Sequence, residues 1–419
     1  MADLLKLDAL VHALSSTAAA FRCRRTLQPA GGPGDKVFPP TYAGAVYAVE
    51  ERRVRNANGE DEVVPCVLLD AVQSSANRME EALQEAVDAG ELALPVIEVR
   101  FPDKELLQPV GRITSLQAPH RSADAILRDS LLNGTPFPAS DVGQRLARCT
   151  LQNATALYEY CPTALVFGLW DSTGPRGGLG AKFARAIVSE IMGMNASFGT
   201  KTSSRIDPLG IQLKAGPVYR SAGGPLGWTL DEKQATSKGK DPERIKDGKP
   251  SQVNHGNIAP SLSAIDRESG RPLAGGVTIS HAEQSIVLSL PALRRLRFPD
   301  GDGKLNPARD AAARTVLAAL GLCASTLAMD KGLDLRSRCL LWPEQPAEWE
   351  LLDIPGSDPK RFTLDHNSAI ALLKESVVAA AKHGLRWSGP IALTASDPLV
   401  ELVRKSQELA LKEGSEESE

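Results

Sequence analysis

A glycine-rich segment at residues 174–185, GPRGGLGAKFAR, is the first part of the sequence whose residue types could do chemistry. We expect it to join a strand to a helix, where backbone N–H groups and the helix dipole can hold a phosphate group. It is not a P-loop, because no Gly-Lys-Ser/Thr sequence follows at the required spacing, and it lacks the GxGxxG pattern, because Phe183 takes the third glycine's place. Lys182, Arg185 and Ser189 would share one helix face and could follow phosphates; a tight turn is the plainer interpretation.

A second candidate is the KTSSR sequence formed by Lys201, Thr202, Ser203, Ser204 and Arg205. Small hydroxyl side chains between two cations suit contacts to the phosphates and sugars of a nucleic acid. They equally suit an exposed strand edge. Because the glycine-rich segment lies close by in the sequence, we favour nucleic-acid binding.

The residues that usually catalyse reactions or hold metals form no recognisable set. His120 could cap a helix, stack or titrate, but a general base needs a partner that the sequence does not identify. The six histidines show no HxH or HxxxH spacing, the six cysteines form no CxxC pair, and no GxSxG occurs. Asp171 and Asp207 are candidate metal carboxylates, yet both lie in Gly/Pro turns, where such residues usually cap. We expect no metal, no cofactor and no enzymatic activity.

Hydrophobic periodicity predicts the elements that must position these residues. A helix at residues 72–87 would start at a capping-box-like pair, Asp70 and Gln73. Residues 214–276 break the pattern and read as a polar insertion. The irregular alternation of strands and helices favours an α+β fold over a doubly wound sheet. The predicted strands are 43–49, 63–69, 96–101, 113–116, 163–170, 198–206, 277–290, 338–341 and 349–352, and the predicted helices are 4–14, 72–87, 119–132, 181–192, 308–329, 365–382 and 398–412.

Composition limits the possible partners. With 42% hydrophobic residues in 419, the chain can bury a large core, and its net charge of −3 argues against nucleic-acid binding by bulk charge. Between residues 165 and 220, however, seven basic residues stand against three acidic ones. Residues 413–419 form an acidic tail that we expect to be flexible. There is no signal peptide, and the longest apolar stretch, 316–324, is far shorter than a membrane span, so we expect a soluble cytoplasmic protein without membrane contact.

Four stretches together resemble one family. They are LDAVQSSANRMEEAL at 69–83, APHRSADAILRDS at 118–130, TALVFGLWDSTGPRGGLGAKF at 163–183 and KTSSRIDPLG at 201–210. In this combination they are similar to the backbone subunit of type I-G (formerly I-U) CRISPR Cascade surveillance complexes, within the RAMP superfamily. The resemblance extends over about residues 40–355.

The resemblance implies a modified RRM-like (ferredoxin-like) palm with large insertions, including a thumb-like projection, in a single domain over residues 1–412. Several copies would line up along one guide crRNA with other complex subunits, bind complementary target DNA in antiviral defence and recruit a separate nuclease-helicase. The subunit itself would not be catalytic. No aromatic pattern of an ordinary RRM occurs, so we expect contacts to the RNA backbone. The candidate RNA-binding residues are Asn77, Arg78, His120, Arg121, Trp170, Ser172, Thr173, Arg176, Lys182, Arg185, Lys201, Thr202, Ser203, Ser204 and Arg205.

Two other functions fit the same residues. One is a RAMP-type endoribonuclease that uses Asp171, Asp207 or His120. The other is a nucleotide-binding regulatory protein that uses the loop at residues 174–182. RNA cleavage with magnesium would distinguish the first, and nucleotide binding the second.

Overall fold

The computed structural model describes residues 2–55, 58–171, 182–223, 226–239, 241–263 and 274–417. The chain divides into two compact units. The first comprises residues 1–101, 110–197 and 277–399, and the second comprises 102–109, 198–276 and 400–419. Ten α-helices and several mixed sheets occur among the described residues, so the predicted α+β class is confirmed.

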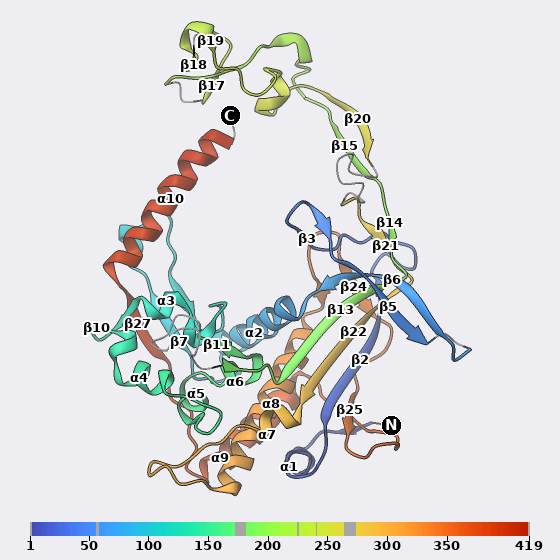
Figure 1. Ribbon diagram of the computed structural model, residues 1–419, viewed down its shortest axis with the longest axis vertical. Helices are drawn as coiled ribbons and strands as arrows, with labels where there is room; N and C mark the ends of the chain where they lie inside the picture. The colour runs from blue at the N-terminus through green and yellow to red at the C-terminus, as the bar shows by residue number, and fades with distance from the viewer. Residues whose placement is uncertain are drawn as a thin grey trace. The chain divides into compact units, whose positions relative to one another are not determined.

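A ten-stranded sheet forms the centre of the first unit (Figure 1). Its main path runs β1-β26-β25-β2-β22-β13-β6-β5, and β24 pairs with both β2 and β23 beside that path. The pairs are antiparallel except β1 with β26. In chain order the strands are β1 (Asp3–Leu4), β2 (Ala20–Pro29), β5 (Val49–Arg55), β6 (Asp61–Asp70), β13 (Ile187–Met194), β22 (His281–Ser289), β23 (Leu333–Asp334), β24 (Leu340–Pro343), β25 (Trp349–Leu352) and β26 (Lys360–Thr363).

Helices cover one face of this sheet, with α8 (Pro307–Asp330) at their centre (Figure 1). α8 begins at Asn306, whose side chain accepts hydrogen bonds from the next helical N–H groups. A Cβ at Gly321 would lie 3.3 Å from Val166 Cγ1 and 3.4 Å from Leu288 Cδ1, so glycine lets α8 pack closely on the sheet. Around α8 lie α1 (Leu7–Ser15), α2 (Val72–Asp88), α6 (Thr163–Phe167), α7 (Leu290–Arg294) and α9 (His366–Ala381).

By length and composition α8 could cross a membrane. The apolar stretch at 316–324, which is part of α8, is by itself too short to do so. However, 83% of the most apolar window of α8 is buried inside the chain. Its burial is that of the core helix of a soluble protein. The hydrophobic residues of α8 thus lie in the core of the first unit.

A second, five-stranded sheet packs in the same unit in the order β10-β9-β27-β7-β8. β27 pairs with β7 in parallel, which joins a late segment of the chain to an early one. The strands are β7 (Ile97–Arg100), β8 (Arg112–Thr114), β9 (Ser130–Leu132), β10 (Thr135–Pro136) and β27 (Ile391–Ala395); η2 (Arg121–Ala123), α3 (Ala125–Arg128), η3 (Phe137–Ala139), α4 (Asp141–Ala147) and α5 (Thr155–Tyr160) lie between them in sequence.

The second unit contains the insertion predicted at 214–276. Two antiparallel strands, β15 (Lys201–Arg205) and β20 (Ile258–Ser263), form an arm that holds the insertion. Beyond the arm, Val218, Ile245 and Val253 form a small buried cluster. Short elements surround it: η5 (Leu213–Ala215), β16 (Tyr219–Arg220), β17 (Trp228–Thr229), η6 (Glu232–Gln234), β18 (Ser237–Lys238), β19 (Asp241–Pro242) and η7 (Pro250–Val253).

The C-terminal helix α10 (Asp397–Glu417) continues from the first unit into the second. Within the second unit, Gln407 Oε1 accepts hydrogen bonds from the N–H groups of Leu107 and Gln108. The helix predicted at 398–412 is confirmed, as are those at 308–329, 365–382 and 72–87. The remaining described strands are the pairs β3 (Thr41–Tyr42) with β4 (Val46–Tyr47), β11 (Leu169–Trp170) with β12 (Lys182–Phe183), and β14 (Ser197–Phe198) with β21 (Val277–Thr278).

Three predicted elements were wrong. The strand at 163–170 is helix α6 followed by β11, because a short run of buried apolar residues has the same pattern in either structure. The helix at 181–192 is instead strands β12 and β13, because β13 is paired on both sides by β22 and β6. The helix at 119–132 breaks into η2, α3 and β9.

The predicted capping box at Asp70 and Gln73 was also wrong. The N-cap of α2 is Ala71, which makes no side-chain cap hydrogen bond. Asp70 is buried and accepts hydrogen bonds from the hydroxyls of Ser74 at 2.5 Å and Ser75 at 2.7 Å. The carboxylate therefore holds the first turn of α2 through side chains.

Candidate nucleic-acid interface

A buried ion pair links α2 to the loop before α3. Arg121 Nε and Nη2 donate to Glu80 Oε1 and Oε2, each at 2.7 Å, and Arg121 Nη1 donates to the carbonyl of Gly168 at 3.0 Å. Both side chains are almost fully buried. Burial raises the pKa of Glu80 to about 7, while the charge of Arg121 acts in the opposite direction. Arg121 therefore holds the fold together and does not lie on the surface, which removes it from the group of surface contacts that we predicted.

The turn between α6 and β11, whose Gly168 carbonyl Arg121 contacts, requires a glycine. Gly168 has φ 90°, and a Cβ there would lie 2.9 Å from Arg185 Cγ and 3.2 Å from the carbonyl oxygen of Phe183. Arg185 is half-buried and donates Nε to the carbonyl of Phe167 at 3.2 Å. Glycine avoids both the steric contact and the strain of a positive φ. Arg121 and Arg185 thus fix the turn between α6 and β11 from two sides.

This turn presents an exposed pair of side chains. Trp170 on β11 and Lys182 on β12 are directly opposite each other in the hairpin, with Lys182 Nζ 5.4 Å from the centre of the Trp170 ring. Trp170 is 58% exposed, which is unusual for a residue with so much apolar surface. η2 packs against β11, and His120, exposed, directly precedes η2. A base could stack on such a ring, and the ammonium group could contact a phosphate.

The predicted contacts on α2 have different environments. Asn77 is exposed. Arg78 Nε lies 3.4 Å from Asp70 Oδ2, and its Nη2 donates to the carbonyl of Leu335 at 2.6 Å. Arg78 therefore ties α2 to the segment after β23, and Asn77 remains as the accessible residue of the two.

The predicted residues Ser172, Thr173 and Arg176 lie outside the described residues. Asp171, described, precedes them. The Trp170–Lys182 pair encloses residues 171–181 of the sequence. Ser189, placed beside Lys182 by the predicted helix, is buried on strand β13. Lys182, Arg185 and Ser189 therefore do not share a helix face.

The second unit contains the KTSSR sequence as strand β15. Lys201, Thr202, Ser203 and Ser204 are all exposed, and the Ser203 hydroxyl hydrogen-bonds to that of Ser261 on β20 at 2.7 Å. Arg205 differs from them, because it donates Nε to the carbonyl of Gly256 at 3.0 Å and Nη2 to that of His255 at 2.8 Å. The described strands of the arm therefore present hydroxyls and the Lys201 ammonium group, while Arg205 ties the arm to the insertion.

Asp207, one of the two carboxylate candidates for metal chemistry, binds backbone N–H groups. Asp207 Oδ1 accepts from the N–H of Leu209 at 2.9 Å, and Oδ2 accepts from the N–H of Gly256. These hydrogen bonds lower the pKa of Asp207. In the part of the chain that the structure describes, no three His, Cys, Asp or Glu side chains gather as a metal site would require. The turn-capping interpretation of Asp207 is confirmed.

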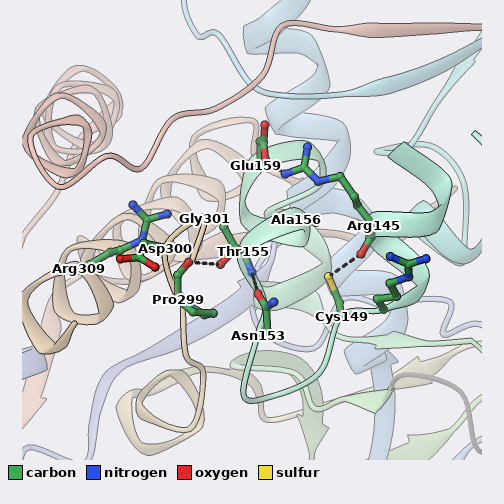
Figure 2. Close-up of a pocket in the computed structure, with 11 residues that line it drawn as sticks. Arg145, Cys149, Asn153, Thr155, Ala156, Glu159, Pro299, Asp300, Gly301 and Arg309 are labelled. Carbon is green, nitrogen blue, oxygen red and sulfur yellow. Dashed lines mark hydrogen bonds and ion pairs between the residues drawn. The ribbon is translucent and has the colours of Figure 1, made fainter. Parts of the chain in front are cut away.

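A cavity of about 350 Å³ lies beside α4 and α5 (Figure 2). Arg145 Nη2 contacts Glu159 Oε2 at 2.5 Å, and Arg309 donates to the carbonyls of Phe298 and His383. Burial raises the pKa of the Cys149 thiol to about 11, so it stays protonated at neutral pH and is a poor nucleophile. The arginines on the walls mostly join segments of the fold.

Sequence reasoning missed Glu80 and Gly168. A signal for Glu80 exists: it lies one turn from Ala76 on the apolar side of α2, where a carboxylate needs a buried partner. No comparable signal marks Gly168, because the chain contains 35 glycines. The partner of Glu80 could not be identified either, since Arg121 is 41 residues away.

Comparison with known families adds to this geometry. Residues 21–198 match the family described as CRISPR-associated protein GSU0053 (Cas_GSU0053). The match covers less than half of the 419 residues. It includes the Glu80–Arg121 pair, Gly168 and the Trp170–Lys182 hairpin, and it ends before β15. No curated protein matches the chain. This part of the chain is therefore similar to CRISPR-associated proteins.

Proposed function

We propose that the chain is the non-catalytic backbone subunit of a type I-G CRISPR effector complex. In this proposal it is a RAMP protein of the cytoplasm, and its first unit is an RRM-like palm. Copies of it oligomerise along guide crRNA, contact other subunits and support binding of complementary target DNA. Two features support it: the similarity of residues 21–198 to CRISPR-associated proteins, and the exposed arm.

The arm is the observation that carries the proposal. β15 and β20 are exposed on both faces, with Arg205 alone half-buried. An isolated two-stranded ribbon is at best marginally stable in water, so this one gains from a partner along its length. Its hydroxyls and the Lys201 ammonium group suit phosphate and sugar oxygens, which carry no sequence information. The arm is our candidate for the thumb-like projection.

The Trp170–Lys182 pair supplies a second contact on the first unit. The ring offers a surface for stacking any base, and the ammonium group beside it can meet a phosphate. Both modes tolerate any sequence, as a subunit that follows a variable guide requires. Among the predicted RNA-binding residues that the structure describes in the first unit, His120 and Asn77 are also exposed.

RNA binding by the purified chain tests the proposal. We expect binding to single-stranded RNA with little sequence preference and a steep loss of affinity with salt, because counterions are released. The double variant Lys182→Ala, Lys201→Ala should bind several-fold more weakly. The matched control is Lys238→Ala, Lys304→Ala, which removes two exposed lysines elsewhere in the two units. Equal affinity of both double variants, or strong preference for one sequence, would contradict the proposal.

Incubation with labelled RNA and magnesium tests the absence of catalysis. We expect full-length RNA after prolonged incubation. Cleavage by the wild type that is lost on Asp171→Asn or Asp207→Asn would instead establish an endoribonuclease.

A further inference from the structure

The central sheet contains a gap beside β2. On one side β2 pairs with β25 through residues 20–22 and with β24 through residues 27–29. No described strand pairs with residues 23–26 on that side, where the link between β24 and β25 departs from the sheet after a hydrogen bond from Glu344 N–H to the Thr26 carbonyl. A cavity of about 480 Å³ occupies the gap, and arginines and glutamates dominate its lining.

Three of the four arginines on the cavity wall have carboxylate partners. Arg22 Nη2 lies 2.7 Å from Glu350 Oε2. Arg24 Nη2 lies 3.5 Å from an oxygen of Glu283. The third, Arg361, lies 3.3 Å from Glu348. These pairs neutralise most of the charge on the wall.

The fourth arginine differs. Arg25 is only 9% exposed, and its one hydrogen bond runs from Nη1 to the neutral Gln284 Oε1 at 3.3 Å. Its Nε is buried without a hydrogen-bond partner. Among the residues that the structure describes, no carboxylate lies within ion-pair distance of it. Burial lowers the pKa of Arg25, and the charge of Asp330 only partly opposes this. The cavity therefore holds a buried guanidinium group without a counter-ion.

Such a group is costly unless something pairs with it. An arginine does not release its proton at physiological pH, so it cannot avoid the cost of desolvation by becoming neutral. An anion inside the cavity would accept from the Arg25 guanidinium group and restore the balance of charge. We propose that this cavity binds a phosphate group, with Arg25 as the buried cation that recognises it.

A nucleotide fits the surroundings better than a bare ion. The cavity is several times larger than one phosphate, and the amides of Gln284 and Gln345 line it. Arg24 and Thr26 lie on one face of the sheet, and Arg25 and Gln284 lie on the other, because side chains alternate along a strand. The phosphate is thus carried by RNA or by a free nucleotide. The site itself does not rest on the proposed function; only an RNA source does.

Thermal unfolding of the full chain tests the site. In inorganic phosphate, compared with chloride at equal ionic strength, we expect the wild type to gain about 2 °C in Tm more than Arg25→Met. Methionine keeps much of the volume and removes the unpaired charge, so this variant should fold. Arg25→Gln is the second variant if it does not. The control Arg53→Met removes an exposed arginine on β5 and should keep the wild-type gain. An equal gain in wild type and Arg25 variants would overturn the proposal.

Two further measurements identify the source of the phosphate. If RNA supplies it, Arg25→Met weakens single-stranded RNA binding and lowers the salt slope by about one. If a free nucleotide supplies it, RNA affinity is unchanged, while AMP raises the Tm of the wild type and not of Arg25→Met. A carboxylate from a second copy would give a different result: self-association lost in Arg25→Met, with no phosphate dependence, which would overturn the proposal. Failure of the wild type to bind RNA would contradict the proposed function and leave the phosphate measurement intact.

Discussion

Arg121 and Glu80 meet through two parallel hydrogen bonds of 2.7 Å, which join α2 to η2, 41 residues later in the chain. Arg121 also has φ 53°, a conformation that a non-glycine residue adopts only when its surroundings hold it there. The pair and the bond to Gly168 place η2 beside β11, so this buried contact sets the position of the exposed Trp170–Lys182 hairpin.

Replacing Arg121 by methionine should strongly destabilise the first unit. Without Arg121 the pKa of the buried Glu80 rises further, so at about pH 8 its carboxyl group must take up a proton or remain charged without a partner. Breaking a buried pair in this way typically costs about 3–5 kcal/mol. The double variant Arg121→Met, Glu80→Leu should recover much of that loss, since both charges are then absent. Urea unfolding of the wild type and the two variants measures this. A single variant as stable as the wild type would contradict a structural role for the pair.

The stability contributed by Glu80 should depend on pH. Burial raises its pKa from 4.5 to about 7, so the folded chain holds this proton more tightly than the unfolded chain. That contribution is complete below about pH 4.5 and is lost as the pH rises through about 7. The free energy of unfolding of the wild type, minus that of Glu80→Gln, should therefore fall by up to roughly 3 kcal/mol over this range. Denaturant titrations at several pH values test this; a difference that grows with pH would refute it.

Much of the scaffold could be predicted from periodicity. α8 was predicted within one residue at each end. Its Ala-rich run begins after Asn306, a good N-cap, and is too long to be a strand. β13 could not be predicted in the same way. Phe183, Ile187 and Ile191 recur every four residues as on a helix, while pairing with β6 and β22 decides the strand. Those partners are distant in sequence, so the local pattern does not contain them.

The candidate site was predictable only in part. For exposed residues such as Lys182, Trp170 and Lys201, the residue type itself indicates a possible contact with RNA. Arg121 and Arg185 are basic residues of the same kind, but their guanidinium groups bind inside the fold. Arg121 contacts Glu80 and the carbonyl of Gly168, and Arg185 contacts the carbonyl of Phe167. Whether an arginine faces solvent or the fold depends on such long-range contacts.

Gly168→Ala should disturb the hairpin specifically. A methyl group at this position meets Arg185 Cγ at 2.9 Å, and φ 90° is strained for alanine. We expect a loss of about 1–3 kcal/mol in stability. Quenching of tryptophan fluorescence by acrylamide should also change if Trp170 moves. Gly223→Ala, where a Cβ meets nothing within 4 Å, is the control and should change neither property.

Trp170→Ala should weaken RNA binding without unfolding the chain. The side chain is mostly exposed, so its loss costs little stability, whereas a lost stacking contact costs about 1–3 kcal/mol of binding. The loss should be similar for unrelated RNA sequences and should leave the salt slope unchanged, because the ring carries no charge. Lys182→Ala should instead lower that slope by about one. Fluorescence anisotropy across a salt series separates the two effects, and identical slopes in both variants would contradict the assigned roles.

Leu262→Ser should impair assembly while leaving the free chain folded. Leu262 lies on β20 opposite Thr202 and is 76% exposed, so serine removes apolar surface that no described part of the chain covers. If the arm inserts between neighbouring copies, that surface is buried on assembly, and a leucine contact of this kind contributes about 1–3 kcal/mol at each interface. The loss repeats along the RNA, so assembly should fail before single-copy binding does. Ile354→Ser, an exposed apolar position in the first unit, is the control. Sedimentation of RNA-bound complexes measures the effect, and normal assembly of Leu262→Ser with unchanged thermal stability would show that the apolar side of the arm has no part in copy-to-copy contact.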